Sequence, residues 1–212
     1  MATKADLLAK INDDLARSDL ATQVTDAIDY AIEQNERERF WFNEEDNISV
    51  TLSSGVAQLA LSALPKKMFQ LDRVRVKQSS GTFIDMYGRD RNWIAARQDI
   101  QATSMPIEYC VYDEAIQFDS LADQNYTLVI DGIVGLGNTT ASNSYSSASA
   151  VAWFNEARNL IRSVAKRDLY THVIKDFDFA ARMRETEQFE FMQLKARTNR
   201  INVTGQVRPT RF

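Results

Sequence analysis

The sequence predicts an α+β fold: a helical bundle from N-terminal and C-terminal helix pairs, with an inserted antiparallel β region and an extended C-terminal arm. Apolar residues recur at helical spacing over residues 5–37 and again over residues 149–174. Residues 47–133 instead hold short runs in which apolar and polar side chains alternate. A single amphipathic helix is not stable alone in water, so the helices of the two ends are expected to cover one another.

The N-terminal pair is predicted as one helix over residues 5–17 and a second over residues 19–37. Ser18 or Asp19 is expected to cap the second helix, because a side-chain oxygen there can accept a hydrogen bond from a free backbone N–H. The short link makes the two helices neighbours in space. No glycine precedes Gly55, which agrees with a helical opening.

The inserted region is expected to be β-rich and to open with the aromatic, β-prone residues 39–43. The expected strands are residues 47–52, 56–61, 70–78, 82–87, 107–113, 115–118 and 126–133. Ser-Ser-Gly turns follow the first and third of these strands, and they predict two β-hairpins. A short helix is expected over residues 89–99, and a polar loop runs from Gly135 to Ser149.

The C-terminal pair is predicted as a long helix over residues 149–174, capped by Ser147 or Ser149, and a last helix that begins at Asp176 or Asp178. The apolar stripe of the last helix is weak, with Phe179, Ala180, Met183, Phe191 and Leu194 interrupted by Glu187. Such a stripe suits a helix that is partly exposed or that packs on another subunit. The expected segments are therefore residues 1–39, 40–148, 149–198 and 199–212.

Charge is strongly separated along the chain, although the formal net charge is only −4. Residues 1–50 carry five basic and twelve acidic side chains, whereas residues 195–212 carry five basic side chains and no acidic one. This separation indicates an oriented assembly or a tail that docks elsewhere. The plainer alternative is a solvated acidic helix face and a frayed basic end. The acidic balance argues against a free DNA-binding protein.

No residue pattern predicts catalysis, a cofactor or a metal site. His172 and Cys110 are the sole residues of their types, so neither has the partners that metal binding or nucleophilic catalysis needs. The glycines of residues 132–137 lack the lysine of a phosphate-binding loop. Carboxylates that could pair or hold Mg²⁺ are Asp113, Glu114, Asp119 and Asp131, but acids at strand ends are usually solvated. We expect no enzyme.

Targeting and membrane signals are not found in the sequence. No apolar run approaches the roughly 20 residues of a membrane-spanning helix. Residues 1–17 form an acidic amphipathic pattern rather than a signal peptide. A single cysteine excludes an intrachain disulfide and fits a reducing, intracellular origin.

Two groups of segments carry a resemblance to a known family. The first group is residues 12–17 (Asn-Asp-Asp-Leu-Ala-Arg), residues 27–28 (Ala-Ile) and residues 36–44 (Glu-Arg-Glu-Arg-Phe-Trp-Phe-Asn-Glu). The second is Trp153, residues 165–170 (Ala-Lys-Arg-Asp-Leu-Tyr) and residues 204–212 (Thr-Gly-Gln-Val-Arg-Pro-Thr-Arg-Phe). In these segments, and in its helix–β–helix order, the chain resembles the adaptor, or head-to-tail connector, proteins of short-tailed bacteriophages.

The resemblance implies a structural protein of the virion neck, assembled in the host cytoplasm and without a membrane partner. It implies a homo-oligomeric ring, usually a dodecamer, below the portal protein, with tail nozzle or fibre proteins on its other face. Genome DNA would pass through the central channel without specific binding. The C-terminal arm would lie along the portal, and the residues expected at the portal interface are Arg197, Arg200, Val203, Val207, Arg208, Pro209, Arg211 and Phe212.

Two other interpretations stay open. One is a monomeric, non-catalytic α+β binding module or phage accessory protein, with a self-packed C-terminus. The other is a hydrolase that uses acids of the β region, namely Asp113, Glu114, Asp119 and Asp131.

Overall fold

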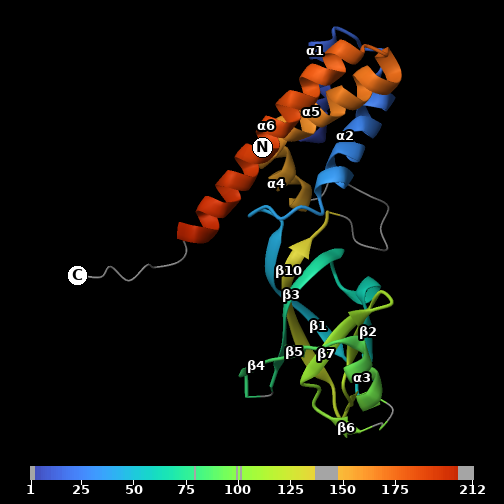
Figure 1. Ribbon diagram of the computed structural model, residues 1–212, viewed down its shortest axis with the longest axis vertical. Coiled ribbons are helices and arrows are strands. Elements are labelled where there is room, and N and C mark those ends of the chain that lie inside the picture. Colours follow the sequence, from blue (N-terminus) through green and yellow to red (C-terminus); the bar gives the residue numbers. More distant parts are fainter. Residues whose placement is uncertain (1–2, 79, 99, 101, 137–147, 205–212) are drawn as a thin grey trace, which may run out of the picture. The chain divides into compact units, whose positions relative to one another are not determined.

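The computed structural model describes residues 3–78, 80–98, 100, 102–136 and 148–204 of the chain. The fold is mixed α+β, which confirms the predicted class (Figure 1). The chain divides into two compact units: a helical unit of Met1–Asn43 with Asn143–Phe212, and a β unit of Glu44–Ser142.

The helical unit opens with α1 (Lys4–Leu15) and α2 (Ala21–Asn35). Thr3 caps α1 because its hydroxyl accepts from the Asp6 N–H, while the Asp6 carboxylate accepts from the Thr3 N–H. The predicted side-chain cap of α2 is wrong. Leu20 occupies the cap position, and the Asp19 carboxylate is instead bound by the guanidinium of Arg17.

The predicted long helix is three successive elements: α4 (Ala148–Glu156), α5 (Arg158–Asp168) and the π-helix η2 (Leu169–Ile174). Backbone hydrogen bonds on both sides of Ala157 keep the chain helical across the first junction. Helix α5 contacts α1, α2, α4 and α6, and five of its residues are buried among them. Of its two predicted caps, Ser147 lies outside the described residues, and Ser149 lies inside α4 rather than at its start.

Helix α6 (Phe177–Thr204) begins where the sequence predicted, since Asp176 accepts a hydrogen bond from the Phe179 N–H. Its end was predicted wrongly. Residues 199–204, assigned to an extended arm, continue the helix, because no glycine or proline interrupts the chain before Gly205. The remainder of that arm, residues 205–212, lies outside the described residues.

Ion pairs join α6 to the rest of the helical unit. Glu187, which interrupts the apolar stripe, accepts hydrogen bonds from the Arg167 guanidinium on α5. Arg167 also donates to Gln34 on α2 at 3.0 Å, so one arginine connects three helices. Asp14 on α1 pairs with both Arg162 and Lys166 of α5. The apparent break in the stripe is therefore a polar contact between helices.

The β unit contains two four-stranded sheets. One has the order β1 (Glu44–Leu52), β10 (Tyr126–Val134), β3 (Met68–Lys77), β4 (Phe83–Asp85). The other has the order β2 (Gln58–Ala60), β8 (Ala115–Phe118), β7 (Glu108–Tyr112), β5 (Tyr87–Gly88). A small pair joins β6 (Thr103–Ser104) to β9 (Leu121–Ala122), and a short 3₁₀ helix, η1 (Leu61–Ala63), follows β2.

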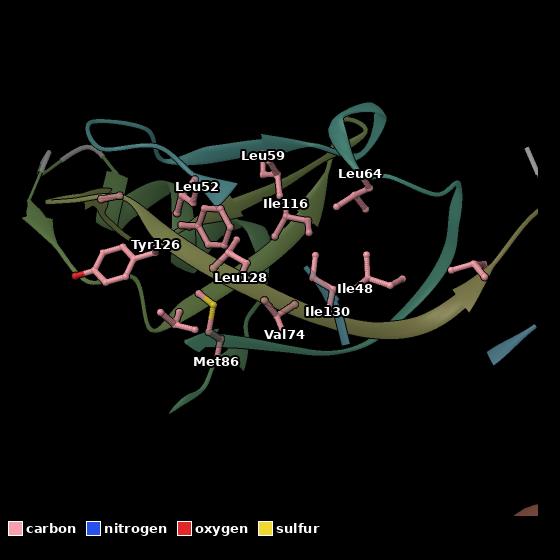
Figure 2. Packing of buried hydrophobic residues seen from close by; sticks show 14 residues of the cluster. Ile48, Leu52, Leu59, Leu64, Val74, Met86, Ile116, Tyr126, Leu128 and Ile130 are labelled. Atoms are coloured by element: carbon pink, nitrogen blue, oxygen red, sulfur yellow. The ribbon is translucent and has the colours of Figure 1, made fainter. Parts of the chain in front are cut away.

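Side chains of the two sheets share one apolar core (Figure 2). Ile48 and Leu128 from one sheet and Ile116 and Phe118 from the other are all buried in it. Strand β10 supplies four members of this core, and it pairs with β1 on one side and β3 on the other. The long central strand therefore organises the β unit.

The first predicted hairpin is wrong. β1 pairs with β10, and β2 pairs with β8, although the turn at residues 53–55 was correctly placed. After that turn the chain crosses to the other four-stranded sheet, and within the turn the Gly55 N–H donates to the carbonyl of Ala122 on β9 at 2.7 Å. The second predicted hairpin, β3 with β4, is confirmed. Strands β5 and β7 pair in parallel, and so do β6 and β9. The prediction of an antiparallel β region contained no parallel pair.

Helix α3 (Arg91–Gln98) packs on β7 and β8 of the β unit, and its position confirms the predicted short helix. A buried carboxylate attaches it. Glu108 of β7 accepts a hydrogen bond from the Trp93 indole N–H at 2.6 Å and another from Arg89 at 2.8 Å. The Trp93 hydrogen bond holds the pKa of Glu108 below its ordinary value, against the opposing effect of burial, and the Arg89 hydrogen bond adds to the lowering.

Replacing Glu108 with glutamine is expected to destabilise the protein by about 1–2 kcal/mol at neutral pH, because the charge-assisted hydrogen bonds are lost. The pKa of Glu108 is lower in the folded state, so its contribution is present above the unfolded pKa and is lost as pH falls through the folded value. Urea unfolding at neutral and acidic pH measures this contribution, and the variant should lose part of the acid sensitivity.

Asp85→Asn is the matched control for this experiment. The Arg73 hydrogen bond also lowers the pKa of Asp85, but both side chains are about half exposed, so solvent screens the pair and little stability should change. If Glu108→Gln were as acid-sensitive as the parent protein, the role given to Glu108 would be wrong.

Candidate assembly interface

The segment between α2 and β1 is a pair of turns, not the β-prone start of a strand that the sequence predicted. Asn43 holds these turns. Its side-chain oxygen accepts from the Phe40 N–H at 2.8 Å, and its amide donates to the carbonyls of Glu36 and Glu38 at 3.2 and 2.8 Å. The Asn43 side chain thus supplies hydrogen bonds to backbone groups that no strand pairs with here, and the aromatic side chains of the segment pack against the helices.

Five aromatic rings form a cluster inside the helical unit. Phe40 lies in edge contact with Trp153 of α4 and with Phe191 of α6, at centroid distances of 5.9 Å each. Phe42 stacks on Phe40 at 5.3 Å and meets Trp153 at 5.0 Å, and Trp41 packs against Phe42. The cluster thus joins α4 and α6 to the segment after α2, with the geometries that aromatic pairs prefer.

Two cations of α6 close over this cluster. The Lys195 ammonium lies 5.1 Å from the Phe40 ring centroid and 5.4 Å from that of Phe191. It also pairs with Glu38 at 2.7 Å. The Arg197 guanidinium lies 4.4 Å from the Trp41 ring centroid and pairs with Glu156 at 2.9 Å. Cation–π contacts of this kind attach the end of α6 to its own chain.

The predicted portal-interface residues fall into two groups. Arg197, Arg200 and Val203 lie on α6, so this part of the expected arm is helical rather than extended. Arg197 is already bound to Trp41 and Glu156 of its own chain, although its side chain stays about half exposed. The other five lie outside the described residues: Val207, Arg208, Pro209, Arg211 and Phe212.

The sequence did not single out the large apolar side chains on the solvent side of α6. Phe189 and Met192 are 60% and 70% exposed, and Phe177 is 67% exposed. Phe189 and Met192 lie on the side of the helix away from Ala180 and Leu194, which are buried, whereas Phe177 stands at the first residue of the helix. The signal was present, since an i, i+3 apolar pair outside the core stripe is unusual on a solvated helix face.

The residues considered for chemistry have structural roles or remain exposed. Asp131 pairs with Arg75 at 2.8 Å, and Asp119 accepts from the backbone N–H groups of residues 107 and 108. Asp113 and Glu114 form a two-residue turn between β7 and β8, both with positive φ, which suits an antiparallel hairpin. Asp131, Asp119 and the Asp113–Glu114 turn thus have different surroundings, and the four acids do not form one site.

Cys110 and His172, the single cysteine and the single histidine of the chain, lie on different elements of the described structure. Cys110 is buried in β7, and burial raises the pKa of its thiol. His172 lies on η2, largely exposed, with its Nε2 atom 3.6 Å from an Asp168 oxygen. Within the described residues, no three His, Cys, Asp or Glu side chains are arranged to hold a metal ion.

Comparison with known proteins adds no assignment, because no protein-family model and no curated protein matches the sequence. Among the helices of the described ranges, none combines the length and the apolar character that crossing a bilayer requires.

Proposed function

We propose that this chain is a structural virion protein: a head-to-tail adaptor that forms a homo-oligomeric ring, joins the portal to the tail and lines the DNA channel. In this proposal the helices of the helical unit pack as a bundle and form the ring body. The β unit faces the tail nozzle or fibre proteins, and the basic C-terminal segment lies on the portal protein. The protein is located in the virion neck and catalyses no reaction.

The observation that carries the proposal is the solvent side of α6. A helix of 28 residues is about 42 Å long, and this one exposes Phe177, Phe179, Phe189 and Met192. Phe189 and Met192 are neighbours at i and i+3, and adjoining exposed apolar side chains are typical of contacts with other proteins. A helix of this kind suits a subunit that is completed by its neighbours.

The segments that resemble adaptor proteins support the proposal in a second way. Residues 36–44 come from one end of the sequence and Trp153 from the other, and both belong to the aromatic cluster of the helical unit. The resemblance therefore falls on residues that contact one another. The alternative, a monomeric binding module, differs in that it would remain a single species in sedimentation whatever partner is added.

The portal assignment is tested by removing residues 205–212. The cut follows Thr204, the last described residue of α6, so the described helix is kept. We expect at least about tenfold weaker binding to the portal protein of the same phage, because interface arginines and aromatic residues carry much of the binding energy. Co-sedimentation with purified portal measures the affinity, and circular dichroism should show unchanged helix content.

A full-length chain with Gln206→Ala and Thr210→Ala is the matched control, since neither side chain is among the residues named for the portal interface. This control should bind as the parent does. If the truncated chain bound portal with undiminished affinity, the assignment of the C-terminal segment would be wrong.

A further inference from the structure

A second surface, in the β unit, has the composition of a protein interface. We call it the α3 face and define it by Tyr87 of β5, Arg89, Arg91, Trp93 and Arg97 on and before α3, and Tyr112 of β7. Strand β7 pairs with β5 and also carries α3, so the three elements lie next to one another (Figure 1). Its three aromatic side chains are between 40% and 62% exposed. Arginine, tryptophan and tyrosine are the residues most enriched where binding energy concentrates.

Two arginines of the α3 face lie over aromatic rings, and the charge of one of them, Arg97, also acts on the Glu108 carboxylate without a direct contact among the described residues. The Arg91 guanidinium lies 3.5 Å from the Tyr112 ring centroid, and that of Arg97 lies 5.2 Å from the Trp93 ring centroid. Within the described part of the chain, neither pairs with a carboxylate, whereas Arg89 pairs with Glu108. A guanidinium stacked on a ring keeps its N–H edge available, and that edge matches a carboxylate.

The solvent side of α6 offers complementary groups. Glu185, Phe189 and Met192 follow at i, i+4 and i+7, so they lie along one side of the helix, which we call the α6 stripe. All three are exposed, and among the described residues Glu185 has no cationic partner. The stripe therefore presents one carboxylate beside two large apolar side chains, one of them a thioether that packs well on aromatic rings.

We propose that the α6 stripe of one copy docks on the α3 face of a neighbouring copy. Glu185 pairs with one of the two guanidinium groups, Arg91 or Arg97, which lie about 120° apart around α3, while Phe189 and Met192 pack against the exposed rings of Tyr87 and Tyr112. Because the two surfaces differ, the contact is head-to-tail, and repetition of such a contact closes into a ring when the rotation allows. This inference rests on the proposed ring-forming function and names the surfaces by which the copies join.

The test is a charge exchange between the two surfaces in the full-length protein. One variant carries Arg91→Glu and Arg97→Glu, and the other carries Glu185→Arg. Each alone should weaken self-association at least about tenfold, because like charges then face each other. Mixing the two variants should restore association, since each then meets an opposite charge. Sedimentation velocity over a concentration series measures the effect, with circular dichroism as the folding check.

Arg73→Glu is the matched control, because Arg73 is an exposed arginine of the same unit on β3 and should leave association unchanged. Oligomers that form equally well from either charge-reversed variant, or a mixture that stays as weak as its components, would overturn the pairing while leaving the ring itself possible. A parent protein that remains a monomer at every concentration would also overturn it. Arginine variants that lose affinity for a labelled DNA duplex with unchanged sedimentation would assign the α3 face to nucleic acid instead.

Discussion

Replacing Trp153 with alanine is expected to lower the free energy of unfolding of the helical unit by about 3–5 kcal/mol. The Trp153 side chain is 1% exposed and lies in edge contact with Phe40 and Phe42. Truncation leaves a large cavity at the point where α4 meets the segment after α2, and neighbouring rings can fill it only in part. Chemical unfolding followed by circular dichroism measures the loss.

The matched control is Phe189→Ala, which removes an aromatic side chain that is 60% exposed and should change stability by less than about 0.5 kcal/mol. Hydrogen exchange resolved by peptide should show faster exchange in α4, α5 and α6, with the β10 peptides little changed, because the β unit has its own core. A Trp153→Ala protein as stable as the parent would show that the aromatic cluster does not hold the helical unit together.

Replacing Gly132 with alanine is expected to destabilise the β unit and to leave the helical unit unchanged, the reverse of the effect of Trp153→Ala. A Cβ atom at this position would lie 2.1 Å from the Gln70 carbonyl oxygen and 3.0 Å from the Met68 sulfur. The obstacle is backbone of the paired strand β3, at an irregularity in its register with β10. We expect a loss of about 3 kcal/mol, the upper end of the range for overpacking, because the central strand must move.

Gly88→Ala is the matched control for this substitution. An added Cβ at Gly88 meets the Tyr109 side chain no closer than 3.7 Å, which is ordinary contact, so the change should be within about 0.5 kcal/mol. Urea unfolding of both variants, with exchange rates of the β3 and β10 peptides, separates them. Equal stability of the two alanine variants would mean that β3 and β10 do not approach as closely at Gly132 as the structure has them.

The parts of the fold that were predictable from sequence depend on local signals. The periodicity of α1 and α2, the alternation in β3 and the aspartate at the start of α6 each act within a few residues. The pairing of β1 with β10 does not depend on such a local signal, because most of the β unit lies between these two strands in the sequence. A turn signal marks where a chain reverses, but burial against distant strands decides which strand it joins.

The candidate interface was less predictable than the fold. Arg197 belonged to a basic tail by charge alone, yet its guanidinium is bound to Trp41, a partner that only tertiary structure could supply. The α3 face was missed because its arginines and aromatic residues come from three elements that are adjacent in space and not in sequence. Exposure of Phe189 and Met192 likewise follows from which side of α6 meets α5.

The most direct test of the proposed function is an electron cryomicroscopy map of the intact virus that encodes this protein. We expect density for the chain as a closed ring between the capsid portal and the tail, with residues 205–212 of each copy ordered against the portal. A map that places the protein elsewhere in the particle, or that shows this terminus folded back on its own subunit, would contradict the proposal.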